Sequence, residues 1–301
     1  MVILPTVKES KGIVYLERAW EKEYVKEGYL EFLLIMRIRN YKELFIQIEN
    51  TLRKESSLSS KLFNLHFGKF KNLNYKGLLD KDIFWIIVYV TFYSGMRSSI
   101  VSQKLASIKS YFYDFKKVKD YSEKEINQIL NDPKIICHKQ KINACITNAL
   151  EFDKLLKKYG SFRKYLESFG SLKDEAIIDR LRVDLKSKFR YLGKITVNHF
   201  LKDLGINVLK PDIVICRIFS RLGLIDHKEN ITQAIKVGRK FAGATGYPIS
   251  YIDIIFVKYG QMGKDEYFGL KNGICLEKNP RCTACKIKQY CNYYARNDNN
   301  K

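Results

Sequence analysis

Apolar residues recur every three to four positions along most of this chain, which is the spacing of amphipathic helices. Strict alternation of apolar and polar residues, typical of strands, is not convincing anywhere in the sequence. Short polar breaks such as Ser94-Gly95 and Gly160-Ser161 separate the helical segments. We therefore predict an all-α fold of helices joined by short loops. The segments with this spacing are 80–93, 98–113, 122–130, 134–158, 161–169, 172–188, 196–204, 213–222, 230–242 and 250–259.

The charge balance indicates which class of molecule the protein binds. The 301 residues include 54 Lys and Arg but only 32 Asp and Glu, a formal net charge of +22. The excess is spread along the chain, so a polyanion such as nucleic acid is the expected partner. The alternative explanation is a general bias toward lysine in the proteome. The apolar run 83–93 is too short to span a bilayer, and the first residues lack the features of a signal peptide. We expect a cytoplasmic, nucleoid-associated monomer that does not bind membranes.

Four of the seven cysteines lie close together near the end of the chain: Cys275, Cys282, Cys285 and Cys291. Four thiolates in one loop can enclose a metal centre. A zinc site usually pairs two Cys-x-x-Cys knuckles and this loop has one, so the spacing favours a [4Fe–4S] cluster over zinc. Disulfides come third, because nothing else indicates a secreted protein. The three other cysteines are scattered, and their simplest interpretation is as reduced thiols in the core: Cys137, Cys145 and Cys216.

The pattern Cys-x6-Cys-x2-Cys-x5-Cys resembles the iron–sulfur loop of the endonuclease III and adenine glycosylase branch of the helix-hairpin-helix (HhH-GPD) DNA glycosylases. The segment 129–149, followed by 160–169, is similar to a second branch, 3-methyladenine glycosylase I. These resemblances imply a helix-hairpin-helix domain and a helical iron–sulfur domain. We assign residues 1–75 to an N-terminal helical extension, 76–212 to the first domain and 213–301 to the second. Lys278 and Arg281 in the cysteine loop are then expected to meet phosphates.

The stretch 189–205 resembles the hairpin of this superfamily, with Tyr191 standing where the first glycine would be. Backbone N–H groups at a tight turn and a helix start can bind one phosphate without reading sequence. An ordinary turn between two helices is the alternative interpretation. The residues expected at the DNA are Tyr191, Leu192, Gly193, Lys194 and Thr196.

Asp212 follows Pro211 at the start of the next helical segment, where the resemblance places the catalytic aspartate. A carboxylate beside the sugar would stabilise the positive charge that develops during glycosidic cleavage. Its plainer role is the N-cap of the helix 213–222, and the two roles are compatible. Bifunctional relatives form a Schiff base through a lysine at the position that Ile195 occupies here. The chain should therefore be a monofunctional glycosylase that uses water.

The base pocket and the wedge that displaces the base are expected at Tyr89, Tyr93, Met96 and Arg97. In the 3-methyladenine relatives a glutamate shortly before the turn 94–97 recognises the purine, and Val90 occupies that position here. We predict a repair enzyme for damaged double-stranded DNA, with an alkylated purine such as 3-methyladenine as first substrate. The alternatives are a deaminated, oxidised or mismatched base, a non-catalytic iron–sulfur DNA-binding protein and a zinc-bound RNA-binding protein.

Overall fold

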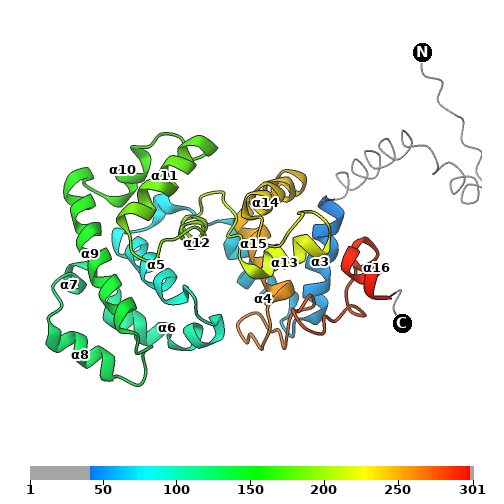
Figure 1. Cartoon of the computed structure of the whole chain (residues 1–301), viewed down its shortest axis with the longest axis horizontal. Helices are drawn as coiled ribbons and strands as arrows, with labels where there is room; N and C mark the ends of the chain where they lie inside the picture. The colour runs from blue at the N-terminus through cyan, green and yellow to red at the C-terminus, as the bar shows by residue number, and fades with distance from the viewer. Residues whose placement is uncertain (1–40, 299–301) are drawn as a thin grey trace, which may run out of the picture.

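The computed structural model describes residues 41–298, and every regular element in that range is a helix (Figure 1). The predicted all-α class is confirmed. The nearest approach to a sheet is one isolated antiparallel bridge between Asp265 and Leu270. No helix in this range has the length and apolar character needed to cross a membrane. Residues 1–40 of the expected N-terminal extension lie outside the described range.

The described helices form two lobes, each around its own hydrophobic core, which lie side by side in Figure 1. The first core draws on residues between Ile83 and Val208, in one continuous stretch of chain. The first lobe contains α5 (Asp80–Tyr93), α6 (Ser98–Phe112), α7 (Phe115–Val118), α8 (Glu123–Asn131), α9 (Lys139–Tyr159), α10 (Phe162–Glu167), α11 (Glu175–Lys188) and α12 (Thr196–Asp203).

The second core combines both ends of the described chain: Tyr41 to Phe67 pack with Leu209 to Ile287. Residues 41–71 thus belong structurally with the segment that follows α12. The second lobe contains α3 (Tyr41–Glu55), α4 (Ser60–Gly68), the 3-10 turn η2 (Lys69–Lys71), α13 (Ile213–Arg221), α14 (Ile231–Thr245), α15 (Ile249–Gly260), the 3-10 turn η4 (Lys288–Tyr290) and α16 (Asn292–Asp298). The 3-10 turn η3 (Tyr75–Gly77) lies on the link to α5.

Local signals set many of the helix ends. Ser122 and Glu125 form a capping box at α8, with the Ser122 N–H donating to the Glu125 carboxylate over 2.8 Å. Gly160 ends α9 with φ +83°, a left-handed conformation that glycine adopts without steric cost. Asp82 does not occupy the cap position of α5. It lies in the first turn of α5 and accepts from the N–H of Leu79, the residue that occupies the cap position.

One predicted helix starts too early. The apolar pattern of 134–158 suggested a single helix, whereas α9 begins only at Lys139. Residues 133–138 form a turn, because the Lys104 ammonium on α6 binds the carbonyls of Pro133 (2.7 Å) and Ile135 (2.9 Å). Those carbonyls are the acceptors that a helix would have used for its own N–H groups.

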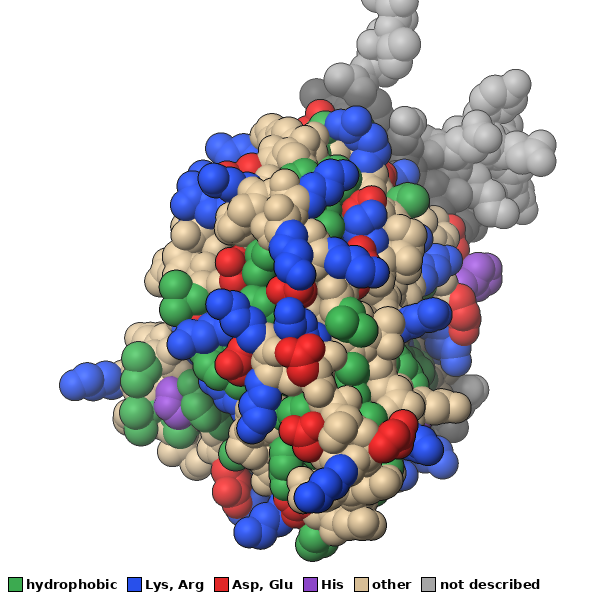
Figure 2. Space-filling view, turned by 90° about the vertical axis from the view of Figure 1, so that its left-hand side faces the viewer, with side chains coloured by type: hydrophobic (Ala, Val, Ile, Leu, Met, Phe, Trp, Pro, Cys, Tyr) green, Lys and Arg blue, Asp and Glu red, His purple; other side chains and the backbone are tan. Residues whose placement is uncertain are grey.

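The excess positive charge is not gathered at the far end of the first lobe. Figure 2 looks onto the end that is on the left in Figure 1, and Lys and Arg side chains there are interspersed with Asp, Glu and apolar groups. Electrostatics therefore does not single out this end as a binding face, and the search for a site turns to the seam between the lobes.

Candidate active site

Asp212 lies where the chain passes from the first lobe to the second, as the N-cap of α13. Its Oδ1 accepts two hydrogen bonds, from the N–H groups of Val214 and Ile215, both over 3.0 Å. Its Oδ2 lies 3.8 Å from the Lys210 ammonium. One carboxylate oxygen therefore holds the helix while the other is not committed to the backbone. The predicted cap and a role in chemistry are geometrically compatible.

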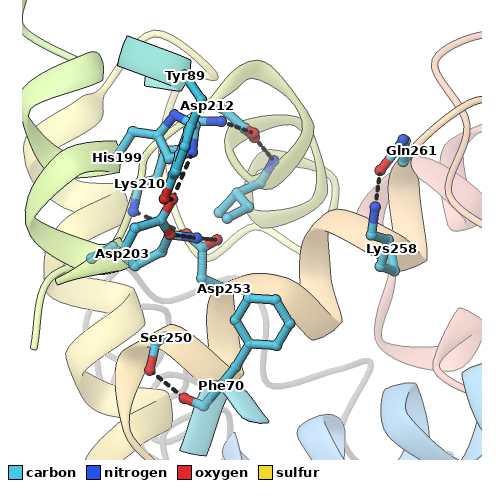
Figure 3. A network of polar contacts seen from close by, with 12 residues as sticks. Phe70, Tyr89, His199, Asp203, Lys210, Asp212, Ser250, Asp253, Lys258 and Gln261 are labelled. Carbon is cyan, nitrogen blue, oxygen red and sulfur yellow. Dashed lines mark hydrogen bonds and ion pairs between the residues drawn. The ribbon is translucent and has the colours of Figure 1, made fainter. Parts of the chain in front are cut away.

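The segment before Asp212 is fixed from behind by α15. The Lys210 N–H donates to Oδ2 of Asp253 over 3.0 Å, and Asp253 is 1% exposed. The buried ammonium of Lys202 lies 2.7 Å from Asp203 and 3.5 Å from Oδ1 of Asp253. Figure 3 shows Asp203, Lys210 and Asp253 close together. Asp203 and Lys202 belong to α12, and Asp253 belongs to α15. The seam between the lobes is thus joined by a buried cation between two carboxylates.

Burial and charge act against each other in this network. Burial raises the pKa of Asp253 to about 6, and the Asp212 charge adds to this, while Lys202 opposes it. Burial would lower the pKa of Lys202, but its two carboxylate partners outweigh that effect and raise it above the ordinary value. Burial likewise acts to raise the pKa of Asp203, and Lys202 with His199 reverses the direction and holds it low. Lys202 and Asp203 form the charged pair at the centre.

The network continues to the tyrosines predicted for the base pocket. The Tyr89 hydroxyl donates to Oδ2 of Asp203 over 2.8 Å, and His199 Nε2 lies 3.2 Å from the same oxygen. The His199 ring is 6.1 Å from that of Tyr89 and 5.9 Å from that of Tyr93, measured between centroids. Burial lowers the pKa of His199 to about 4, and the Lys210 charge adds to this, so the imidazole is neutral near pH 7. The structure thus joins the predicted residues Tyr89 and Asp212 through groups from both lobes.

The wedge turn, residues 94–97, contains the predicted wedge residues Met96 and Arg97 and directly follows α5. Gly95 has φ +69°, Met96 is partly buried and Arg97 is exposed. The buried ammonium of Lys141 on α9 donates to the carbonyls of Thr91, Phe92 and Ser94, at 2.5, 3.2 and 2.5 Å. The same ammonium lies 4.8 Å from the centroid of the Tyr191 ring. Lys141 therefore holds the wedge turn and the hairpin together.

The hairpin between α11 and α12 has a defined internal bonding pattern. Tyr191 adopts φ +64°, the left-handed conformation expected of the glycine it replaces. The Gly193 N–H donates to the Thr196 hydroxyl over 2.7 Å, and that hydroxyl donates to the Tyr191 carbonyl over 2.6 Å. The backbone N–H groups of Lys194 and Ile195 find no acceptor within residues 41–298.

These bonds change which hairpin groups can meet an anion. The N–H groups of Lys194 and Ile195 are free donors, and both residues are exposed. The Gly193 N–H is already engaged, and Leu192 is buried at 2% exposure. Leu192 and Gly193 therefore shape the turn, and Lys194 combines a free N–H with a charged side chain.

The four clustered cysteines line one pocket, together with Arg221, Tyr293 and Tyr294. Two of the sulfurs accept hydrogen bonds: Cys275 from Arg221 Nη1 over 3.3 Å and Cys285 from the Tyr259 hydroxyl over 3.1 Å. Within residues 41–298 no three Cys, His, Asp or Glu side chains converge closely enough to hold a single metal ion. A tetrahedral zinc site needs its four sulfurs about 2.3 Å from one point, whereas a cubane cluster binds one sulfur at each corner. Each of the four thiols that line this pocket could bind one corner of such a cluster.

The cysteine loop is bonded to the helix that Asp212 caps. Arg217 Nη2 donates to the carbonyls of Gly260 (2.7 Å) and Cys275 (3.2 Å). Arg221 Nη1 donates to the Leu276 carbonyl over 2.6 Å. The two arginines are one turn apart on α13, so the helix reaches from the candidate catalytic carboxylate at its start to the loop at its end.

The two predicted DNA contacts in this loop differ. Lys278 is exposed. Arg281 forms an ion pair with Glu55 at the end of α3, with 2.5 Å between Nη2 and Oε2. Its guanidinium is therefore partly used inside the second lobe.

Sequence reasoning missed the centre of the network. From the sequence, no role was assigned to His199, Lys202, Asp203, Lys210 or Asp253. The i, i+4 spacing of His199 and Asp203 on α12 was the one local signal that could have been used. Val90, which replaces the glutamate of the 3-methyladenine relatives, is fully buried, so it does not take over that residue's polar role.

Comparison with known proteins supplies the family. Residues 76–230 match the model of the methyladenine glycosylase family, slightly more than half of the chain. Similar solved structures include 3-methyladenine DNA glycosylase I from Staphylococcus aureus, at 21% identity over 52% of this chain and 92% of that one, with a TM-score of 0.41. A variant of the same enzyme matches at 22% identity over 49% of this chain and 88% of that one, with a TM-score of 0.41. A variant of 3-methyladenine DNA glycosylase I in complex with 3-methyladenine matches at 21% identity over 51% of this chain and 91% of that one, with a TM-score of 0.42. This chain belongs to the methyladenine glycosylase family, and it is accordingly a DNA glycosylase, an enzyme that hydrolyses N-glycosyl bonds.

Proposed function

We propose that the protein is a monofunctional DNA N-glycosylase that flips an alkylated purine out of duplex DNA and hydrolyses its bond to the sugar. 3-Methyladenine is the first candidate, since it is the base named for the similar solved enzymes. The observation that carries the proposal is Asp212: one oxygen caps α13 and the other faces Lys210 in a network that leads to Tyr89.

Base loss passes through an oxocarbenium-like sugar, so a fixed carboxylate lowers the barrier if it lies beside the developing charge. The second oxygen of Asp212 would do this and orient the attacking water. The Lys210 ammonium lies 3.8 Å from that oxygen, on the side away from the cap bonds of Oδ1. The Asp253 carboxylate would act as a positioning group, because it holds the backbone of Lys210.

The expected pocket tyrosines suit a planar base. Tyr89 and Tyr93 lie with ring centroids 6.2 Å apart at 85°, and the neutral His199 ring packs against both. Such a site would hold an alkylated purine by shape and stacking. Ile195, at the position where bifunctional relatives place the Schiff-base lysine, cannot form an imine, which supports hydrolysis by water without strand cleavage.

We also propose that Cys275, Cys282, Cys285 and Cys291 hold a [4Fe–4S] cluster. The cluster supplies a structural anchor when bound, because releasing a base moves no electron. The chain's own residues transmit this anchoring: Arg217 and Arg221 tie the loop to α13. The visible absorbance and the iron and sulfide content of protein purified without oxygen test the cofactor, since zinc thiolate sites are colourless.

The variant Asp212→Asn tests the catalytic assignment. Asparagine retains an oxygen for the N-cap but lacks the charge, so base release from alkylated duplex DNA should fall by about 10³-fold with DNA binding preserved. Asp174 caps α11 in the same way, accepting from Ala176 N–H over 2.9 Å, so Asp174→Asn is a matched control that should keep full activity. Equal single-turnover rates for wild type and Asp212→Asn would remove Asp212 from the mechanism.

A screen of duplexes with single alkylated, deaminated, oxidised or mismatched bases, developed with alkali to reveal abasic sites, decides the substrate. Release of an alkylated purine supports the proposal. Release of another lesion class would keep the chemistry and correct the substrate. Binding without release from any lesion would favour a non-catalytic DNA-binding protein.

A further inference from the structure

The loop 261–273, between α15 and Cys275, carries a side chain that neither the core nor the active site explains. Met262 is 73% exposed, and no other large hydrophobic side chain within residues 41–298 is more exposed. Single exposed apolar residues are common on protein surfaces and need no explanation by themselves. The rigidity and position of this loop are what make Met262 informative.

The loop is clamped on both arms. The Gly273 N–H donates to the Gln261 carbonyl, and the Gly263 N–H donates to Oδ1 of Asn272, both over 2.9 Å. Farther out, Asp265 and Leu270 exchange two backbone hydrogen bonds of 2.7 and 2.9 Å. Gly263 has φ +97°, which a residue with a side chain rarely adopts. Met262 is therefore held out from a braced turn.

The base of this loop reaches across the seam to the wedge turn. The Gln261 amide accepts from Lys258 Nζ over 2.7 Å, shown in Figure 3 at the end of α15, and donates to the Ser98 hydroxyl over 3.2 Å. Ser98 is the first residue of α6 and directly follows the turn 94–97.

A base that leaves the stack opens a gap, and proteins fill such gaps with apolar side chains, methionine among them. Met96 lies on one side of the seam, partly buried in the wedge turn. We propose that Met262 is a second wedge residue, which enters the duplex from the second lobe beside the displaced nucleotide. The inference rests on the proposed function, because it requires a base flipped from duplex DNA.

Two measurements test the wedge. The first uses a duplex with a tetrahydrofuran abasic analogue and 2-aminopurine as the neighbouring base, whose fluorescence rises when it is unstacked. Wild-type protein should raise the signal, and Met262→Ala should abolish most of the rise. The second measures base release from dimethyl-sulfate-treated DNA. Met262→Ala should slow release from the duplex by about tenfold while release from the same DNA as single strands stays within about twofold.

Met262→Leu should behave as wild type in both measurements, since leucine also fills a gap. Val183→Ala is the control for removing exposed apolar surface: Val183 is 63% exposed on α11, and its loss should change neither signal. A wild-type fluorescence rise in Met262→Ala, or equal slowing on duplex and single strands, overturns the inference. If wild type releases no base but the fluorescence difference between wild type and Met262→Ala persists, the wedge stands and the proposed function fails.

Discussion

The two lobes are built differently. The core of the first lobe comes from one continuous stretch, Ile83 to Val208, whereas the core of the second combines both ends of the described chain. The first lobe contributes the tyrosines, the wedge turn and the hairpin, and the second contributes Asp212, Asp253 and the cysteine loop. The residues proposed for base release therefore come together only where the lobes meet. Breaking either lobe should affect activity, but by different routes.

The largest expected effect comes from the cysteine loop. Between Cys275 and Cys291 the buried hydrophobic contribution is small, chiefly Leu276 and Ile287, so apolar packing alone holds this part weakly. Cys282→Ser should remove the visible absorbance and, by loss of metal-linked folding energy, lower Tm by roughly 10 °C. Because Arg221 joins the loop to α13, base release should fall too.

The matched control is Cys137→Ser. Cys137 is an exposed free cysteine of the first lobe, and its loss should change neither the absorbance nor Tm. Unchanged metal content and Tm in Cys282→Ser would show that the loop stands without a cluster.

The second prediction compares one titrating group from each side of the seam. His199, on α12, has a pKa lowered to about 4, so its contribution to stability is lost as pH falls from about 6.5 to 4. Asp253, on α15, has a pKa raised to about 6, so the folded state takes up its proton first and gains stability over nearly the same range. Each contribution amounts to about 3 kcal/mol, and in the wild type they oppose each other.

Urea unfolding at pH 7, 6 and 5 separates the two contributions. Relative to wild type, Asp253→Asn should lose more stability on acidification, because the compensating gain is gone. His199→Gln should lose less stability on acidification. In the wild type the His199 imidazole takes up a proton more readily in the unfolded state than in the folded state, and glutamine has no group that titrates in this range. If both variants follow the wild-type pH dependence, the two groups do not titrate as their surroundings indicate.

The fold class and the local helix signals could be predicted from the sequence because they depend on neighbours in the chain. Pro211-Asp212 ahead of an apolar run predicts an N-cap, and the structure has one. The start of α9 could not be predicted this way, since Lys104, about thirty residues earlier, captures the carbonyls that the helix would use.

The centre of the candidate site was hidden for the same reason. Asp253 lies within the apolar segment 249–257 and meets Lys202 only because α12 and α15 pack together. From the sequence alone, Asp253 and Lys202 would each be interpreted as a charged residue on the surface of a helix. The sequence-based hypothesis could name Tyr89 and Asp212 from a family resemblance, but the buried ion pairs between them depend on tertiary packing that no local pattern encodes.

The smallest expected effect sharpens the comparison within the second lobe. Lys278 is exposed on the cysteine loop, so its ammonium is free to neutralise a phosphate. Lys278→Ala should weaken DNA binding a few-fold and lower the salt slope of log K by about 1. Arg281→Ala should change the slope less, because part of its charge is used by Glu55.

Binding titrations of an undamaged duplex across a salt series measure both slopes. Lys124→Ala, an exposed lysine on α8 at the far end of the first lobe in Figure 1, is the control and should keep the wild-type slope. Equal slopes for wild type and Lys278→Ala would leave the loop as a structural brace without a DNA contact at this residue. A larger slope change for Arg281→Ala than for Lys278→Ala would mean that DNA displaces Glu55 and takes over the guanidinium.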